Sequence, residues 1–207
     1  MRADGREEDG QKDVRAVAIC GSLHAGGSTE HLLKHALKQL QLRGIEGSLV
    51  PMLYKRILPC RNCGACQVRK NGTCQIEGDD FASLYKAMRE ADVLLIGAPV
   101  DHGAAHPDIK ALLTRACSVA HAGKNPFMRK PGSPVAVLAQ EASRSSLQRL
   151  LSWFPTMEMI VPGASGYARV KGSSGLPVRA DAEGYAVMDG LAENLAWLAR
   201  KLTTSGS

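Results

Sequence analysis

Aromatic residues are scarce in this chain: three Phe, two Trp and four Tyr make up 4% of its 207 residues. Proteins that bind single-stranded nucleic acids stack the bases on aromatic side chains, so this scarcity argues against a nucleic-acid partner. Long apolar runs are also lacking, since none approaches the roughly 18 residues that a membrane-spanning helix needs. The first residues, MRADGREEDGQKD, contain no apolar stretch of the signal-peptide type. The sequence therefore predicts a cytoplasmic protein with no membrane partner.

The positive charge is unevenly divided along the chain. The protein carries 26 Lys and Arg against 20 Asp and Glu, a net charge of +6. Residues 1–13 hold three basic and five acidic side chains, so the remainder of the chain carries +8. We expect a disordered tail at 1–13, which is too polar to join a core, and a single domain at 14–204. A basic domain suits anionic ligands such as phosphorylated cofactors, or acidic protein partners.

Short apolar runs alternate with helical patterns after the tail. DVLLIGAPV, residues 92–100, is the clearest buried strand. Asp79 or Asp80 is expected to cap the helix before this strand, and Pro107 is expected in the first turn of the helix after it. Five strands are predicted, at residues 14–20, 48–53, 92–100, 133–140 and 156–163. Strands that alternate with helices predict an α/β fold, a doubly wound five-stranded parallel sheet.

The loop GSLHAGGST, Gly21 to Thr29, joins the first strand to the first helix. Its glycines let a ligand approach the backbone closely, and the unpaired N–H groups at a helix start attract anions. The loop matches neither the G-x-x-x-x-G-K-[ST] nucleotide motif nor the G-x-G-x-x-G dinucleotide motif. Two interpretations stay open: a phosphate site at the carboxyl end of a strand, or a flexible connector in which Ser28 caps the helix.

Four of the six cysteines lie in LPCRNCGACQVRKNGTCQ, residues 58–75. Clustered thiols in a reducing compartment indicate metal binding or catalysis rather than structural disulfides. Structural zinc sites usually use two separated pairs of ligands, whereas C-x2-C-x2-C is typical of bacterial [4Fe–4S] ferredoxins. Arg61, Arg69 and Lys70, with no acidic residue in the segment, offset the charge of four thiolates. The sequence therefore predicts a [4Fe–4S] cluster, with zinc or a metal-free thiol site as alternatives, on Cys60, Cys63, Cys66 and Cys74.

Taken together, these segments resemble the iron–sulfur flavoprotein family, a branch of the flavodoxin-like NADPH-dependent FMN reductases. The resemblance extends from about Val14 to Leu202 and is carried by AICGSLHAGGSTEHLL, CRNCGACQVRKNGTC, CQIEGDDFASLYKAMREADVLLIGAPV and HPDIKALLTRA. It implies a flavodoxin-like fold with a cysteine-rich cluster-binding loop, residues 58–76, after the second strand. It also implies a redox protein that transfers electrons between a [4Fe–4S] cluster and FMN, as an electron carrier or as a reductase of a small acceptor.

The resemblance also assigns a flavin site, and it gives no side chain a catalytic role. The FMN phosphate would contact the loop after the first strand, and the isoalloxazine ring would lie between Ala98–Gly103 and residues 139–144. Asp101 and His102 stand where the family commonly has aromatic residues, so Asp101 would either lower the flavin potential or face solvent. The implied cofactor-binding residues are Ser22, His24, Gly27, Ser28, Thr29, Pro99, Val100, Asp101, His102, Gly103 and Gln140.

The resemblance further implies a homodimer or homotetramer, in which the flavin of one subunit can lie near the cluster of another. Electrons would come from NAD(P)H or from a ferredoxin-like redox partner protein. Two other functions fit the same residues. One is an NAD(P)H-dependent FMN or quinone reductase whose cysteines bind structural zinc or no metal. The other is a non-enzymatic module in which zinc stabilises the fold for binding a partner.

Overall fold

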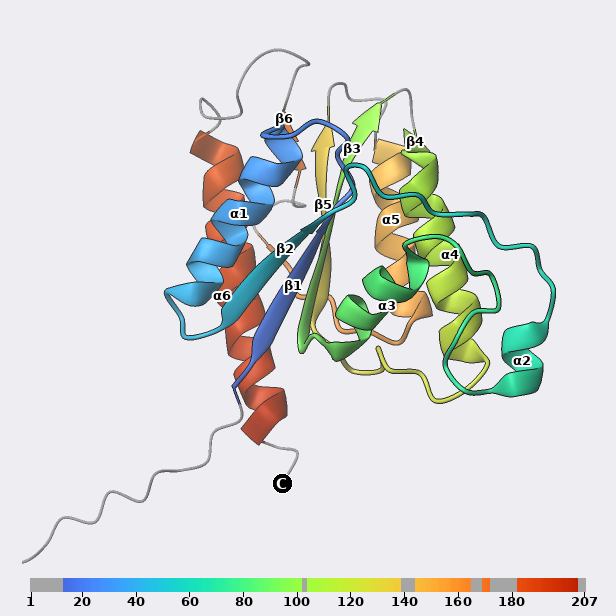
Figure 1. The fold of residues 1–207 in the computed structure, drawn as a ribbon. Coiled ribbons are helices and arrows are strands. Elements are labelled where there is room, and N and C mark those ends of the chain that lie inside the picture. Colours follow the sequence, from blue (N-terminus) through green and yellow to red (C-terminus); the bar gives the residue numbers. More distant parts are fainter. Residues whose placement is uncertain (1–12, 102–103, 139–143, 165–168, 172–181, 205–207) are drawn as a thin grey trace, which may run out of the picture.

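The computed structural model describes residues 13–101, 104–138, 144–164, 169–171 and 182–204, which form a sheet with helices on both faces (Figure 1). The strands are β1 (Arg15–Cys20), β2 (Glu46–Pro51), β3 (Val93–Asp101), β4 (Ala104–Ala105), β5 (Gly132–Leu138) and β6 (Arg169–Lys171). The helices are α1 (Ser28–Gln41), α2 (Ala65–Arg69), α3 (Phe81–Glu90), α4 (Pro107–His121), α5 (Arg144–Thr156) and α6 (Ala182–Thr204).

The main series of the sheet has the order β2-β1-β3-β5-β6, and its neighbours all pair in parallel. The short strand β4 pairs with β3 in the antiparallel direction, outside this series. The chain changes direction across the sheet between β1 and β3. In open α/β sheets, ligands bind at the carboxyl ends of the strands at such a switch point. The topology therefore directs attention to the loop after β1 and to the end of β3.

Each face of the sheet is covered by its own set of helices. Figure 1 shows α1 and α6 on one face and α3, α4 and α5 on the other. Ala16 and Ala18 of β1 belong to the core under α1 and α6, whereas Val17 and Ile19 belong to the core on the opposite face. Because both faces are buried, the strand is apolar along nearly its whole length instead of alternating with polar residues.

Four of the five predicted strands are present, as β1, β2, β3 and β5, but the strand predicted at residues 156–163 is wrong. Thr156 ends α5, and Glu158 takes a left-handed backbone conformation with φ of 58°. The segment then forms one isolated parallel bridge, between Pro131 and Ile160. A positive φ interrupts the extended conformation that a strand requires. The edge beside β5 is occupied by the three-residue strand β6 instead.

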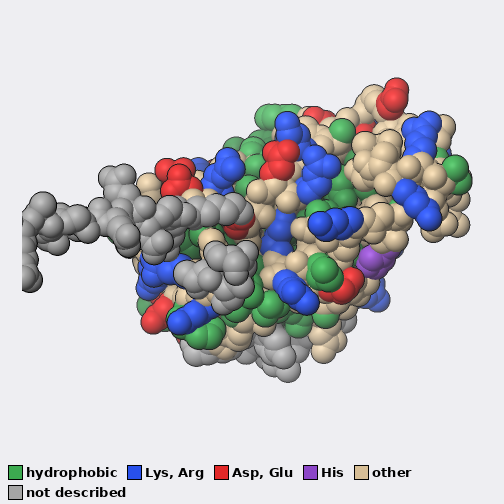
Figure 2. Space-filling view, turned by 90° about the horizontal axis from the view of Figure 1, so that it is seen from below, with side chains coloured by type: hydrophobic (Ala, Val, Ile, Leu, Met, Phe, Trp, Pro, Cys, Tyr) green, Lys and Arg blue, Asp and Glu red, His purple; other side chains and the backbone are tan. Residues whose placement is uncertain are grey.

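The surface on the side where the amino ends of the strands lie carries charged side chains of both signs (Figure 2). Figure 2 views this side and shows Lys and Arg side chains with Asp and Glu side chains among them. A hollow on the protein surface, for example, is lined by Arg89, Arg129 and Asp92 together. In the part of the chain that the structure describes, no helix is both long enough and apolar enough to span a bilayer. The tail predicted at 1–13 lies almost wholly outside the described residues.

The contact between α1 and the sheet depends on a glycine in β3, because a side chain at this position would have no room. A Cβ atom added to Gly97 would lie 2.6 Å from Cδ1 of Leu33 and 2.9 Å from Cγ2 of Thr29. Both of these α1 side chains are buried, at 0% and 2% exposure, so neither has free space into which to move. Glycine at position 97 therefore sets how closely the first turns of α1 approach the sheet.

We expect Gly97→Ala to lower the free energy of unfolding by about 1–3 kcal/mol, because the added methyl group overpacks the contact with Leu33. Urea denaturation, followed by circular dichroism, measures the change. Gly190→Ala is the matched control, since a Cβ at this helical position in α6 meets no atom within 4 Å. The control should stabilise the protein by about 0.5–1 kcal/mol. Equal stability of the two variants would contradict the packing account.

Candidate functional site

The loop between β1 and α1 is seated on β3 and on the first turns of α4. The Gly21 amide donates to the carbonyl oxygen of Gly97 at 2.7 Å. A Cβ at Gly21 would lie only 2.4 Å from Cγ1 of Ile109, so this position has no room for a side chain. The loop thus begins at a fixed place on the carboxyl edge of the sheet, where the sequence predicted it.

Hydrogen bonds within the loop fix its shape. The amide of His24 donates to Oγ of Ser22 at 3.2 Å, and the amide of Gly27 donates to the carbonyl oxygen of His24 at 3.2 Å. Gly26 has φ of +67°, in the left-handed region that glycine tolerates best. Ser22 and Thr29 are buried at the base of the loop, while His24, Gly27 and Ser28 are exposed or half-buried. Of the loop residues assigned to phosphate binding, His24, Gly27 and Ser28 are therefore the ones accessible to a ligand.

One backbone amide of the loop already binds an anionic group. The Gly26 amide donates to Oε2 of Glu30 at 2.8 Å, and Oε1 of the same carboxylate lies 2.6 Å from Nζ of Lys34. The Lys34 ammonium and then the Gly26 amide hold the pKa of the Glu30 carboxyl below its ordinary value. Sequence reasoning missed Glu30 and Lys34, although an acidic residue in the first turn of a helix is a recognisable signal.

The carboxyl ends of β1, β3 and β5 lie side by side, because neighbouring parallel strands end at one edge. Cys20 pairs with Gly97, and Pro99 pairs with Val137. Pro99 is half-buried, and the backbone of Val100 and Asp101 continues β3 and pairs with β4 in the antiparallel direction. The assigned residues His102, Gly103 and Gln140 lie outside the described residues. Those assigned flavin residues that the structure describes thus lie at one edge of the sheet.

The four clustered cysteines surround a single cavity of about 250 Å³. Left-handed backbone at Asn62, Gly64 and Lys70, with φ of 50°, 69° and 50°, lets the segment turn tightly around the short helix α2. Cys63 is exposed, and the other three are half-buried. Helix α4 closes the opposite wall of this cysteine cavity. The residues that line it include Cys60, Cys63, Cys66, Cys74, Arg115, Cys117, Ser118 and His121.

Two of the four thiols contact the same residue of α4. Sγ of Cys60 lies 3.8 Å from Oγ of Ser118, and the Cys66 thiol donates to the Ser118 carbonyl oxygen at 3.5 Å. Among the described residues, no three Cys, His, Asp or Glu side chains are arranged to hold a single metal ion. The four thiols nevertheless line the same cavity.

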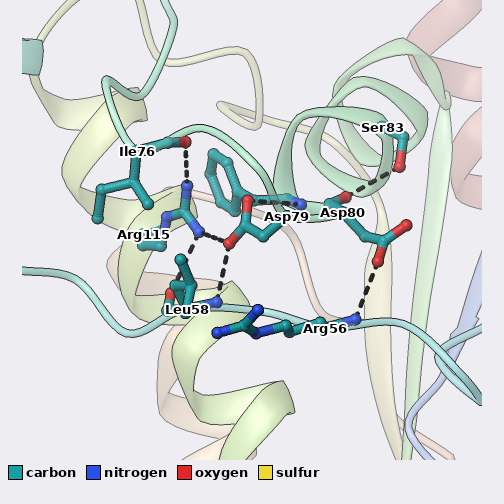
Figure 3. Close-up of polar contacts among 8 residues, drawn as sticks. Arg56, Leu58, Ile76, Asp79, Asp80, Ser83 and Arg115 are labelled. Carbon is teal, nitrogen blue, oxygen red and sulfur yellow. Dashed lines mark hydrogen bonds and ion pairs between the residues drawn. The ribbon is translucent and has the colours of Figure 1, made fainter.

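A buried ion pair joins the two ends of the cysteine segment (Figure 3). The Arg115 guanidinium, with 0% exposure, donates to the carbonyl oxygen of Leu58 at 3.1 Å and to that of Ile76 at 3.0 Å. It also pairs with the Asp79 carboxylate, whose side chain is 2% exposed. Asp79 in turn accepts from the amide of Leu58 at 2.8 Å and from that of Phe81 at 3.3 Å.

These contacts close the loop that carries the cysteines, because Leu58 precedes Cys60 and Ile76 follows Cys74. The guanidinium carbon lies 4.0 Å from the centre of the Phe81 ring, which adds a cation–π contact. Of the two predicted caps, Asp80 is the N-cap residue of α3, but its side chain makes no capping bond; the Phe81 amide instead donates to Asp79, one residue earlier. The role of Arg115 was missed. An arginine within an apolar helical pattern gives no sequence signal of its distant partners.

The two regions lie towards opposite ends of α4. Ile109, in the first turns, contacts the loop after β1, while Ser118 and His121, in the last turns, line the cysteine cavity. At about 1.5 Å per residue, Ile109 and Ser118 are about 14 Å apart along the helix axis. Figure 1 shows the cysteine segment passing outside α4 to α2, which lies near the lower end of α4.

The strand order, with a glycine-rich loop after β1 at the switch point, defines a flavodoxin-like α/β protein. Solved structures share this fold. RosB with bound intermediate 8-demethyl-8-formylriboflavin-5'-phosphate aligns with a TM-score of 0.71 and 17% identity, over 94% of this chain and 82% of that chain. A WrbA-like flavodoxin from Agrobacterium tumefaciens aligns with a TM-score of 0.62 and 12% identity, over 91% and 99%.

The sequence comparisons are more specific. Residues 14–173 match the family of NADPH-dependent FMN reductases. An iron–sulfur flavoprotein of Methanosarcina thermophila is 31% identical over 157 residues, which cover 74% of this chain and 80% of that protein. The chain therefore belongs to the iron–sulfur flavoprotein family, within the NADPH-dependent FMN reductases. Membership indicates a flavin redox function.

We expect Arg115→Met to lower the free energy of unfolding by about 3–5 kcal/mol, because it leaves the Asp79 carboxylate buried without its partner. The double variant Arg115→Met/Asp79→Leu should recover much of this loss, since it also removes the unpaired buried carboxylate. Urea denaturation under reducing, anaerobic conditions measures both.

Lys55→Met is the matched control, because Lys55 forms a 3.3 Å ion pair with Asp80 whose side chains are 30% and 37% exposed. Such an exposed pair contributes only about 0–1 kcal/mol. If Arg115→Met lowered the free energy of unfolding no more than Lys55→Met does, the buried ion pair would not be what keeps the ends of the cysteine segment together.

Proposed function

We propose that this protein transfers electrons between FMN, bound at the carboxyl edge of the sheet, and a [4Fe–4S] cluster bound by Cys60, Cys63, Cys66 and Cys74. The cysteine cavity is the observation that carries the proposal, because one cavity is lined by all four thiols. Its location in a chain of the iron–sulfur flavoprotein family adds support. When bound, the cluster exchanges single electrons and the flavin one or two, so the pair links one-electron and hydride-level chemistry.

The spacing of the cysteines and the cavity they line suit a cluster. All four thiols line one cavity, so each could reach a group bound within it. The compact C-x2-C-x2-C run is typical of [4Fe–4S] ferredoxins, whereas structural zinc sites usually use two separated pairs of ligands. Arg61, Arg69 and Lys70 supply positive charge within the segment, and this charge stabilises thiolates. The role of the chain here is to hold four sulfur ligands and to exclude water with α4.

The loop after β1 suits the FMN phosphate. His24 and Ser28 are accessible, and the Gly26 amide donates to the Glu30 carboxylate, which supports a loop whose amides suit an anion. Gly27 lets the loop fold tightly on itself, because a Cβ there would lie 3.1 Å from the His24 carbonyl oxygen and 3.3 Å from Oγ of Ser22. Pro99, at the end of β3, would border the isoalloxazine ring. These residues bind and orient the flavin, and none of them is required to transfer a proton.

The separation of the two regions along α4 supports a homodimer or homotetramer. Within one chain, the loop after β1 and the cysteine cavity lie towards opposite ends of that helix. Assembly would place the exposed edge of the cysteine cavity, at Cys63, beside the flavin of a second subunit. Electrons would enter from NAD(P)H or from a ferredoxin-like redox partner protein.

Iron and acid-labile sulfide analysis of anaerobically purified protein tests the cluster. We expect about four of each per chain, and large losses of both in Cys60→Ser, Cys66→Ser and Cys74→Ser. Cys117→Ser is the control within the same cavity and should keep its iron. Stoichiometric zinc without iron would instead support the second candidate, an NAD(P)H-dependent FMN or quinone reductase with a structural zinc site.

Glu30→Gln should tighten FMN binding about two- to fivefold, because it removes a negative charge that competes with the phosphate at the start of α1. The lowered pKa of Glu30 keeps this carboxyl ionised at neutral pH, so the charge is present under assay conditions. Fluorescence titration measures the affinity. Riboflavin, which lacks the phosphate, is the matched control and should bind both proteins equally. An equal gain for riboflavin would contradict a phosphate site in this loop.

A further inference from the structure

Two residues of helix α4 that carry hydrogen-bond donors, Ser118 and Arg115, line the cysteine cavity. The Ser118 hydroxyl lies 3.8 Å from Sγ of Cys60, and it also donates to the carbonyl oxygen of Thr114 at 3.0 Å. Arg115 lines the same cavity and is fully buried. Its Nε atom has no hydrogen-bond partner within the described residues, although its other two nitrogens both donate to oxygen atoms. Buried donors without partners are rare in folded proteins and point to a missing acceptor.

The two contacts of Ser118 with the cysteines suit different protonation states of the sulfur atoms. The Cys66 thiol donates to the Ser118 carbonyl oxygen, a group that can only accept, so this contact requires a protonated sulfur. A metal-bound thiolate has no proton to donate and must leave that contact. The Ser118 hydroxyl, in contrast, can turn from Thr114 towards the sulfur of Cys60. Hydrogen bonds to an ionised acceptor are stronger than those to a neutral carbonyl, so a thiolate would attract this hydroxyl.

We propose that Ser118, through its hydroxyl, and Arg115, through Nε–H, donate hydrogen bonds to the sulfur atoms that hold or form the cluster, and thereby raise its midpoint potential. The inference rests on the cluster of the proposed function. Reduction adds negative charge to the cluster, and hydrogen bonds to its sulfurs stabilise that charge. Both residues act as positioning and tuning groups on the ligands, and neither exchanges electrons itself.

A serine in a helix often donates only to the carbonyl four residues earlier, as Ser118 does to Thr114. Two features set Ser118 apart from such a residue. It contacts two of the four cysteines, and it shares the cavity wall with an arginine nitrogen that lacks an acceptor. Ser152 of α5 provides the ordinary case, because its hydroxyl donates to the Arg149 carbonyl oxygen at 2.8 Å and it lines the neighbouring groove between α4 and α5.

The test is a redox titration of the anaerobic holoprotein, followed by the electron paramagnetic resonance signal of the reduced cluster so that the flavin does not interfere. We expect Ser118→Ala to retain its iron and sulfide but to be reduced about tenfold less favourably, which lowers the midpoint by about 59 mV for a one-electron couple. Ser118→Thr keeps the hydroxyl and should restore the wild-type potential. Ser152→Ala is the control and should not change it.

Electron nuclear double resonance before and after exchange into D2O supplies a second readout. The wild type should show exchangeable protons close to the cluster, Ser118→Ala should lose one class of them, and the class from Arg115 Nε–H should remain. An iron-loaded Ser118→Ala variant with unchanged potential and unchanged exchangeable protons would overturn this inference alone. Wild-type protein without iron would overturn the proposed function together with it.

Discussion

The buried ion pair between Arg115 and Asp79 is the constraint on which the cysteine segment depends. Taking both charges out of water is costly, and further hydrogen bonds to the two groups offset this cost. Here the guanidinium bonds to the carbonyls of Leu58 and Ile76, and the carboxylate bonds to two backbone amides. The contacts of the pair therefore close a loop rather than join two helices. A closed loop has already lost the entropy that a metal centre would otherwise have to overcome when it gathers four ligands.

Helix α4 connects this constraint to the rest of the molecule. Its first turns pack under the loop after β1, its middle carries Arg115, and its last turns form one wall of the cysteine cavity. One rigid helix thus fixes the distance between the loop after β1 and the thiols. That distance separates the two regions within a chain, so the proposed exchange of electrons depends on how a second chain is placed. Proximity of the two centres would then be a property of the assembly.

The sequence predicts those features that follow from local periodicity or from a single turn. The apolar runs that became β1, β3 and β5, the glycine-rich loop and Pro107 at the start of α4 are all of this kind. The strand predicted at 156–163 failed because apolar residues around Glu158 are used for packing, while a positive φ breaks the extended backbone. The role of Arg115 could not be predicted, since tertiary folding decides which distant carbonyls it meets. Glu30 bonds to Gly26 and Lys34, each four residues away, so its contacts were within reach of sequence reasoning and were missed. The four cysteines were predicted to share a site because their spacing alone keeps them together.

The most direct measurement of the central claim is X-ray absorption at the iron and zinc edges of anaerobically purified protein. The account predicts iron with a first shell of sulfur and a second shell of iron, as a cube of four irons on four cysteines requires. A zinc edge with a sulfur shell, and no iron in stoichiometric amount, would contradict it. The fold and its anion-binding loop would then remain, and the electron-transfer function would not.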